Sequence, residues 1–330
     1  MPQILVEELS KTYRIAERSP GAWGALKGLA RRRWRTVQAL DQVSFQLERG
    51  ELVGLIGPNG AGKSTTIKIL SGILEPSSGR CEVDGLTPWK QRVRHVARIG
   101  VVFGQRTQLW WDLPVIDGFD LLRDIYRVPP ERYAATRDEL VALMRLEKLL
   151  SQPVRQLSLG QRMRCEIAAA MLHEPQLIFL DEPTIGLDAP SKLAVRDLVA
   201  RLNRERGVTV ILTTHDMHDI EALAERVIVI GAGRILADGP FADLRAGVLA
   251  ERRLVVDFDG ESPALDLAEV RIVARDGRRL ELAFDPRRVA APDLIARIVA
   301  AHPVDDIHVA EPLIEEVIAR FYEKHGAGEA

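Results

Sequence analysis

The feature that most constrains this chain is a glycine-rich loop set between an apolar run and a helix-like segment. Residues 51–56 read ELVGLI, which is typical of a buried strand, and a helix is expected from residue 63 to about residue 70. Glycines in such a loop let backbone N–H groups turn inward around a phosphate, and the following helix presents its positive N-terminal end. The loop therefore predicts a nucleoside triphosphate site, and it consists of Gly57, Pro58, Asn59, Gly60, Ala61, Gly62, Lys63, Ser64 and Thr65.

Two side chains of this loop and two carboxylates further along the chain suit phosphate chemistry. Lys63 can reach the β- and γ-phosphates, and the Ser64 hydroxyl is placed to bind Mg²⁺. Residues 177–180 form an apolar strand that ends in Asp181 and Glu182, at the sheet edge where ligands bind in open α/β folds. Asp181 is a candidate to hold Mg²⁺ through water, and Glu182 to orient and deprotonate the attacking water. Glu182 thus argues against a module that binds nucleotide without hydrolysing it.

Strands alternate with helices through about the first 240 residues, which favours a mostly parallel sheet covered on both faces. After about residue 247 the pattern changes to three strands, a helix, a strand and a helix. We therefore expect an α/β P-loop domain with an added antiparallel element over residues 1–246, and an accessory α+β domain over 247–330. The expected strands are 4–9, 43–47, 51–56, 99–103, 177–180, 208–213, 227–230, 253–258, 270–275, 279–284 and 307–310, and the expected helices are 63–70, 116–126, 132–150, 160–172, 191–205, 217–225, 292–301 and 313–323.

Composition limits the compartments and partners that fit. The 330 residues are 46% apolar and 28% charged with a net charge of −2, so the chain as a whole has no electrostatic attraction to nucleic acid. Its two cysteines, Cys81 and Cys165, suit a reducing cytosol. We see no signal peptide and no apolar run of the roughly 20 residues that span a bilayer. If the chain serves a membrane process, another chain must do the spanning.

Four further segments resemble motifs of one family. Residues 157–161 (LSLGQ) resemble the ABC signature motif, and residues 185–188 (IGLD) resemble the D-loop. Residues 213–216 (TTHD) resemble the switch histidine segment, and Gln105 resembles the Q-loop glutamine. Their order and spacing are similar to those of the nucleotide-binding subunits of ABC transporters across residues 1 to about 240. The resemblance implies a P-loop fold of ABC type, with a parallel core, an antiparallel β subdomain and a helical subdomain.

The resemblance also implies a head-to-tail dimer that holds two ATP molecules between its subunits. A helix end would stabilise the phosphate charge only while the γ-phosphate is present, so hydrolysis would loosen the dimer. The usual signature has a second glycine where this chain has Leu159. The roles implied are Tyr13 at adenine, His215 and Lys63 at the γ-phosphate, Glu182 as catalytic base, Ser64, Gln105 and Asp181 at Mg²⁺, Ser158, Gly160 and Gln161 on the partner's γ-phosphate, and Asp188 in coupling the two sites.

The C-terminal residues bear on which ABC protein this is. Residues 310–317 (AEPLIEEV) resemble the tail of type-two exporter ATPases of the drug, sodium and daunorubicin kinds. That resemblance implies export at the cytoplasmic face of the cell membrane, with separately encoded permease subunits and a second ATP-binding subunit. An importer ATPase remains an alternative because it would share each catalytic motif. A soluble ABC ATPase acting on nucleic acid or ribosomes is a further alternative, although we expect no nucleic-acid partner. The sequence does not identify the cargo.

Two segments are candidates for contact outside the ATP site. By resemblance, the permease would dock on the segment after Gln105, which contains the adjacent Trp110 and Trp111. An apparent insertion over residues 18–36 can form a basic amphipathic helix that rests on anionic lipid or a permease through residues 20–35, or it can be a solvated loop. The apolar face of that helix would contain Trp23, Leu26, Ala30 and Trp34.

Overall fold

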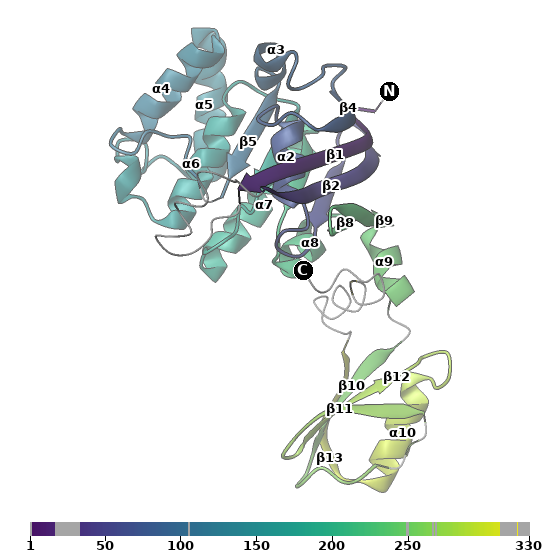
Figure 1. Cartoon of the computed structure of the whole chain (residues 1–330). Coiled ribbons are helices and arrows are strands. Elements are labelled where there is room, and N and C mark those ends of the chain that lie inside the picture. Colours follow the sequence, from purple (N-terminus) through teal and green to yellow (C-terminus); the bar gives the residue numbers. More distant parts are fainter. Residues whose placement is uncertain are drawn as a thin grey trace, which may run out of the picture. The chain divides into compact units, whose positions relative to one another are not determined.

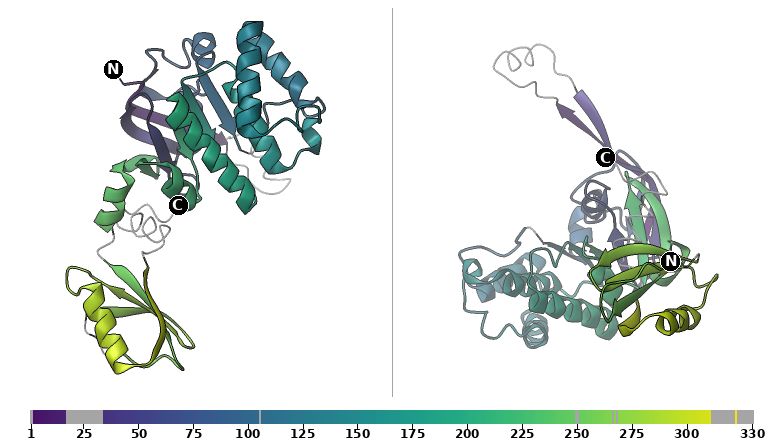
Figure 2. Two further views of the ribbon diagram at one scale, coloured as in Figure 1. Left: turned by 180° about the vertical axis from the view of Figure 1, so that it is seen from behind. Right: turned by 90° about the horizontal axis from the view of Figure 1, so that it is seen from below.

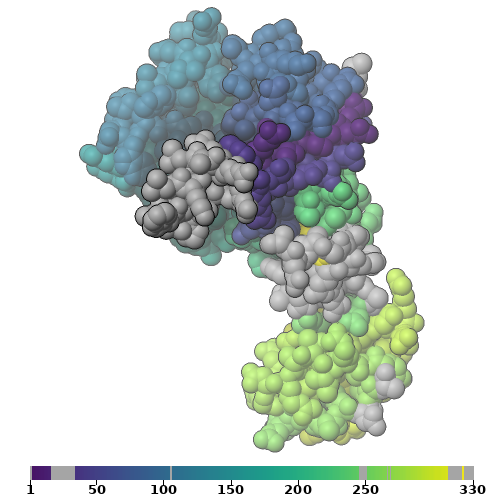
Figure 3. Space-filling view, in the orientation of Figure 1, coloured from purple at the N-terminus to yellow at the C-terminus, as the bar shows by residue number. Residues whose placement is uncertain are grey.

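A computed structural model describes residues 2–16, 34–104, 106–248, 251–265, 267, 269–310 and 322. The chain divides into two compact units, Met1–Phe241 and Ala242–Glu329. Figure 1 shows the elements of each unit, and Figure 3 shows each unit as a filled body. The domain boundary expected at residue 246 stays a prediction.

A six-stranded sheet in the order β5-β6-β7-β3-β8-β9 forms the centre of the first unit in the described part of the chain. Strands β5, β6, β7, β3 and β8 run parallel, and β9 pairs antiparallel with β8. β3 and β7 are buried along their whole length, as parallel strands covered on both faces should be. The strands are β3 Leu52–Ile56, β5 Ile99–Phe103, β6 Leu177–Asp181, β7 Thr209–Thr213, β8 Arg226–Gly231 and β9 Arg234–Pro240.

The helices of this unit fall into two groups. Helices α4, α5 and α6 gather on one side of the unit, where α6 also packs on β5, and α2, α7 and α8 lie against other strands of the sheet (Figures 1 and 2). The parallel core and the helical group that we expected are therefore confirmed. None of the described helices is both long and apolar enough to span a membrane. The helices are α2 Lys63–Leu70, α3 Arg92–Val96, α4 Val115–Tyr126, α5 Pro130–Met144, the 3₁₀ turn η1 Val154–Gln156, α6 Leu159–Met171, α7 Ala189–Arg206 and α8 Met217–Leu223.

An antiparallel sheet in the order β2-β1-β4 forms the expected third part of the unit, from β1 Ile4–Ala16, β2 Trp34–Leu47 and β4 Ser78–Val83. β1 and β2 are longer than expected, because their pairing continues to Ala16 opposite Trp34. The helical interpretation of the insertion is therefore wrong at its end, since residues 34–36 continue the ladder as strand. The rest of that interpretation, residues 17–33, lies outside the described residues.

Other differences from the expected elements have local causes. Helix α5 ends at Met144 and not at residue 150, because Arg145 takes a left-handed φ of 52° and its N–H turns back to the Ala142 carbonyl. β4 was not expected because its first three residues are exposed and carry no apolar pattern. The short helix α3 and the edge strand β9 were not expected either. β9 is only half-buried, which weakens its apolar alternation.

The second unit contains an antiparallel sheet in the order β11-β12-β10-β13. Helix α10 packs on this sheet through Leu294 and Ile298, against Phe258, Leu282 and Phe284. This α+β order is the expected one, although the helix expected at 313–323 lies outside the described residues apart from Tyr322. The elements are α9 Phe241–Val248, β10 Arg252–Phe258, β11 Val270–Asp276, β12 Arg279–Phe284, α10 Ala291–Ala301 and β13 Val304–Ala310.

A half-buried histidine joins the helical group to the sheet of the first unit. The His173 ring stacks on Tyr126 of α4, with ring centroids 3.9 Å apart. Its Nε2–H donates to the Ile99 carbonyl of β5 at 2.9 Å, and its buried Nδ1 has no hydrogen-bond partner among the described residues. Burial lowers the pKa of His173 from 6.5 to about 4, and the charge of Arg132 acts in the same direction. Protonation of this ring therefore opposes folding.

We expect acidification from pH 7 to 4.5 to lower the free energy of unfolding through His173. The unfolded chain takes up this proton near pH 6.5 and the folded chain only near pH 4. As the pH is lowered between these two values, the free energy of unfolding therefore decreases, by about 1.4 kcal/mol per pH unit at most. All five tryptophans lie before residue 112, so tryptophan fluorescence in urea reports on the first unit. His173→Phe should flatten the pH dependence and the exposed-site control His218→Gln should not. Equal slopes for wild type and His173→Phe would contradict the assignment.

Candidate nucleotide site

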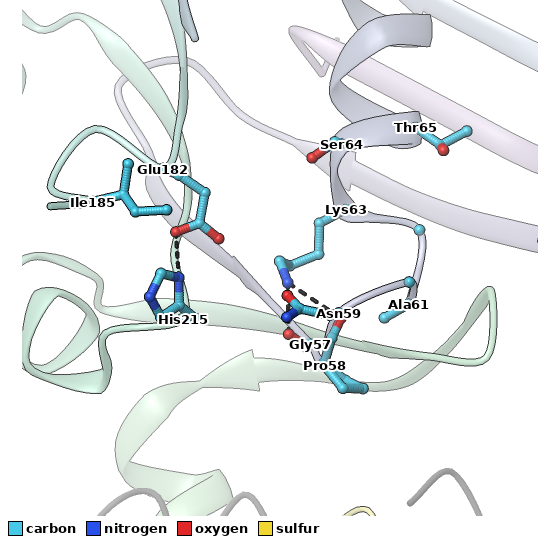
Figure 4. A pocket seen from close by; sticks show the side chains of 12 residues that line it. Gly57, Pro58, Asn59, Ala61, Lys63, Ser64, Thr65, Glu182, Ile185 and His215 are labelled. Atoms are coloured by element: carbon cyan, nitrogen blue, oxygen red, sulfur yellow. Dashed lines mark hydrogen bonds and ion pairs between the residues drawn. The ribbon is translucent and has the colours of Figure 1, made fainter. Parts of the chain in front are cut away.

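A cavity of about 620 Å³ lies where β3, β6 and β7 end. The loop of residues 57–65 follows β3 and forms one wall. Glu182 and Ile185 follow β6, and His215 follows β7, and these three side chains complete the lining. Figure 4 shows the Glu182–His215 pair facing the loop across the cavity. Short parallel strands that end at one sheet edge thus bring together segments more than 150 residues apart.

The loop keeps its shape because two of its positions accept only glycine. Gly62 has a φ of 114°, and a Cβ atom there would lie 2.7 Å from the Ala39 carbonyl oxygen. A Cβ atom on Gly57 would lie 2.4 Å from the Ile230 carbonyl oxygen. Helix α2 begins directly after Gly62, so its free N–H groups point into the cavity region, as an anion site requires.

Lys63 lies over the loop that precedes it. Its ammonium donates to the Gly57 carbonyl at 2.6 Å and to the Pro58 carbonyl at 3.3 Å. Burial lowers the pKa of Lys63, and the carboxylates of Glu182 and Asp181 oppose that shift. The side chain is thus a buried cation at the loop, in reach of any phosphate held there.

Two of the three predicted Mg²⁺ ligands, Ser64 and Asp181, lie together at the end of β6. The Asp181 carboxylate accepts hydrogen bonds from the Ser64 hydroxyl at 3.2 Å and the Thr213 hydroxyl at 2.6 Å. Carboxylate and hydroxyl oxygens are the ligands that Mg²⁺ prefers, so these residues fit that ion. Gln105 lies outside the described residues, but the preceding Gly104 donates its N–H to the Asp181 carbonyl at 2.7 Å.

The Glu182 side chain is paired with His215. The Nδ1–H of His215 donates to the Glu182 carboxylate at 2.6 Å, and the Glu182 side chain is 17% exposed. Glu182 has a φ of 56°, a left-handed conformation that costs energy for a residue other than glycine. A Cβ atom on Gly104 would lie 2.0 Å from the Glu182 carbonyl oxygen, so the turn at Gly104 packs directly on this strained residue.

The signature residues do not line the cavity, and they form the start of α6. The Ser158 hydroxyl accepts from the Gln161 N–H at 3.2 Å, and the Gln161 side chain accepts from the Ser158 N–H at 2.9 Å. This reciprocal pair is a capping box, which satisfies two otherwise free donors at the helix end. Ser158 remains exposed, so the helix end faces outward.

The start of α6 packs against the start of α7. A Cβ atom on Gly160 would lie 2.2 Å from the Ser191 hydroxyl oxygen, so this glycine is required within the subunit. Asp188 caps α7 by accepting from the Ser191 N–H at 3.3 Å. A Cβ atom on Gly186 would lie 3.2 Å from the Leu159 side chain. Leu159, which replaces the usual signature glycine, therefore packs toward the D-loop.

Tyr13 lies on β1 opposite Val37 and does not line the cavity. It is half-buried, and the Lys11 ammonium lies 5.5 Å from its ring centroid. The structure thus brings together residues 57–65, Asp181, Glu182 and His215. It leaves Tyr13, Ser158, Gly160, Gln161 and Asp188 apart from that cavity.

Sequence reasoning missed several residues that support the site. Thr213 was expected as the end of a strand and the start of the switch histidine segment, with no contact assigned to it. Its hydroxyl donates to Asp181 and accepts the Glu182 N–H at 3.2 Å. Glu166 of α6 is buried, and its carboxylate accepts from the Thr107 hydroxyl and the Gln108 N–H. Glu166 therefore fastens the segment after Gln105 to the signature helix. Its only signal in the sequence was an acidic residue within an apolar helix face.

We expect Gly160→Ala to destabilise the first unit by about 1–3 kcal/mol, because the new methyl group overlaps Ser191. Combining it with Ser191→Gly removes the overlapping atoms and should recover part of that loss. Urea unfolding followed by tryptophan fluorescence measures both, with Ser191→Gly alone as the control. A double variant no more stable than Gly160→Ala would show that the close packing at Ser191 is not the cause.

Comparison with known proteins supports one family. A family described as ABC transporter matches residues 40–185. The chain is 34% identical over 294 residues to the daunorubicin resistance ATP-binding protein DrrA3 of Streptomyces coeruleorubidus, covering 87% of this chain and 92% of that protein. It is 30% identical to the linearmycin resistance ATP-binding protein LnrL of Bacillus subtilis, covering 83% and 90%. It is 28% identical to the methionine import ATP-binding protein MetN of Latilactobacillus sakei, covering 87% and 86%.

A solved structure with the same architecture carries nucleotide. It is a dimeric ATP-binding cassette in a post-hydrolysis state bound to ADP and Pi, with 27% identity and a TM-score of 0.59. The match covers 72% of this chain and 98% of that one.

Proposed function

Because the chain belongs to the ATP-binding subunits of ABC transporters, which are ATPases that use ATP with Mg²⁺, we propose that it powers substrate export through separate permease subunits. The observation that carries the hydrolytic part of the proposal is the hydrogen-bonded Glu182–His215 pair facing the phosphate loop. A binding module would need the loop alone. A carboxylate on the far side of the cavity from that loop gives the site a group that can act on water.

In the proposed reaction, a water oxygen bonds to the γ-phosphorus of ATP, and the bond from that phosphorus to the β–γ bridging oxygen breaks. Glu182 accepts the proton that the water loses, and His215 holds the Glu182 carboxylate in place and contacts the γ-phosphate. Lys63 and the N–H groups at the start of α2 neutralise the β- and γ-phosphate charge. The products are ADP and inorganic phosphate.

The metal and the nucleotide base have proposed partners as well. Ser64 and Asp181, with Gln105, would hold Mg²⁺. When bound, Mg²⁺ supplies positive charge at the β- and γ-phosphate oxygens. Tyr13 would stack on adenine.

The signature residues act in trans in this proposal. The exposed start of α6 would meet the γ-phosphate held by a second subunit, with Ser158, Gly160 and Gln161 as its contacts. The capping box supports this role, because it holds the helix end rigid before any partner arrives. Asp188 at the start of α7 packs beside it, so it would relay changes between the two sites.

We expect Glu182→Gln to lower kcat for ATP hydrolysis by about 10²–10⁴-fold, since an amide does not accept the proton. The variant should also accumulate as an ATP-bound dimer, because the γ-phosphate that holds the subunits together persists. Phosphate release and size-exclusion chromatography in ATP and Mg²⁺ measure the two effects. Glu147→Gln, at an exposed position of the helical group, is the matched control. Turnover near wild type in Glu182→Gln would refute the assignment of the base.

Export is favoured by the likeness to the two resistance proteins and by residues 310–317, and import is favoured by the likeness to MetN. Both directions use the same site, so the ATPase chemistry does not distinguish them. A role on nucleic acid or ribosomes is opposed by the net charge of −2. The cargo would be selected by the permease, and the second unit would support dimerisation or regulation.

We expect the tagged chain to co-purify with one or two multi-spanning proteins from detergent-solubilised membranes. Mass spectrometry identifies them, and their topology separates an exporter from an importer. Recovery of ribosomal or DNA-repair proteins without a membrane protein would overturn the transport role.

Peripheral attachment at the cytoplasmic face is part of the proposal, and a variant lacking residues 20–35 tests the lipid contact. Unchanged membrane attachment of that variant would contradict it.

A further inference from the structure

Asp219 of α8 is a fully buried carboxylate that the proposed mechanism does not use. Its side chain has 0% exposure. A buried carboxylate is stable only when its oxygens are paired, because it loses the solvation it has in water. Each of its oxygens has a partner, and these partners come from separate segments.

One oxygen of Asp219 joins the two loops that carry the reactive pair. It accepts hydrogen bonds from the Thr184 hydroxyl and from the Thr214 hydroxyl, the latter at 3.0 Å. Thr184 lies two residues after Glu182, and Thr214 directly precedes His215. Both threonines are buried, so water does not compete for these bonds.

The other oxygen of Asp219 ties this junction to α7, the helix that begins at the D-loop. It accepts from the Arg196 Nε–H at 2.6 Å, and the Arg196 side chain is 16% exposed. A second ion pair runs parallel, from the Lys192 ammonium to the Asp216 carboxylate at 2.5 Å. Burial would raise the pKa of Asp216, but its hydrogen bond and ion pair with Lys192 lower it overall. The loops are thus anchored to a rigid helix.

We propose that Asp219, held by Arg196, is a positioning residue that sets the contact between Glu182 and His215. The single carboxylate holds both loops in position: it binds one loop at Thr184, two residues after Glu182, and the other at Thr214, one residue before His215. The Glu182–His215 hydrogen bond of 2.6 Å follows from that placement. This inference rests on the proposed roles of Glu182 and His215 in hydrolysis.

The first test is Asp219→Asn in the full chain, assayed for ATP hydrolysis with Mg²⁺. We expect kcat to fall about 10-fold to 10²-fold, the scale on which small displacements of a reactive group act. KM for ATP should change less than about twofold, because Lys63 and Ser64 keep their places and uniform binding is retained. The matched control is Asp84→Asn, another little-exposed aspartate ion-paired to an arginine, and its kcat should match wild type.

A double-mutant cycle with His215→Ala separates positioning from a general loss of structure. If Asp219 acts through the Glu182–His215 contact, Asp219→Asn should lower kcat less than about twofold once His215 is absent. Partial unfolding would lower kcat by the same factor in both backgrounds, and that result would overturn the proposal. His215→Ala with wild-type kcat would overturn it too.

A second variant keeps the test decisive if Asp219→Asn does not fold. Thr184→Val removes one hydroxyl from the junction and leaves the Asp219–Arg196 pair intact. It should show the same fall in kcat and the same loss of effect in the His215→Ala background, and a wild-type kcat would refute the proposal. Failure of the proposed function itself is distinct, because Glu182→Gln would then retain turnover.

Discussion

The register between β6 and β7, where the Thr213 hydroxyl donates to the Asp181 carboxylate, is the constraint on which the geometry of the site depends. The two residues lie opposite each other in the parallel ladder of β6 and β7, and Thr213 also lies opposite Leu55 of β3. This register aligns the ends of β3, β6 and β7, so that the loops that follow them begin side by side. A shift of one residue would turn the Asp181 side chain to the other face of the sheet, away from Ser64. Close packing of the buried strands excludes such a shift.

The packing around that register explains where glycine is needed. Gly104, Gly57 and Gly160 each lie against a backbone or side-chain atom closer than a Cβ atom allows. Each of these contacts joins segments that are far apart in the chain: a loop and β8 at Gly57, two strand-end loops at Gly104, and the starts of α6 and α7 at Gly160. Glycine allows the close approach of backbone at Gly57 and Gly104 and of the Ser191 side chain at Gly160, which is a tertiary requirement more than a local conformational one.

The parallel core and the cavity could be predicted from the sequence because their signals are local. β3 and β7 are continuous apolar runs, and residues 57–65 carry a pattern that specifies both shape and chemistry. The role of Asp219 could not be predicted, since an acid in the segment HDMHDIEA reads as a solvated helix face. Only the fold brings Arg196 to it from 23 residues away. The end of α5 at Arg145 was missed for a related reason, because a left-handed arginine gives no glycine signal.

The left-handed backbone of Glu182 has a consequence for how this position evolves. Glycine would adopt the φ of 56° at lower energy, so the fold alone would favour losing the side chain at this position. A glycine there would relieve the backbone, but it would also remove the hydrogen bond that the Glu182 carboxylate accepts from His215. The strained backbone at Glu182 is therefore the local cost of placing a carboxylate, which glycine cannot supply, at the edge of the cavity.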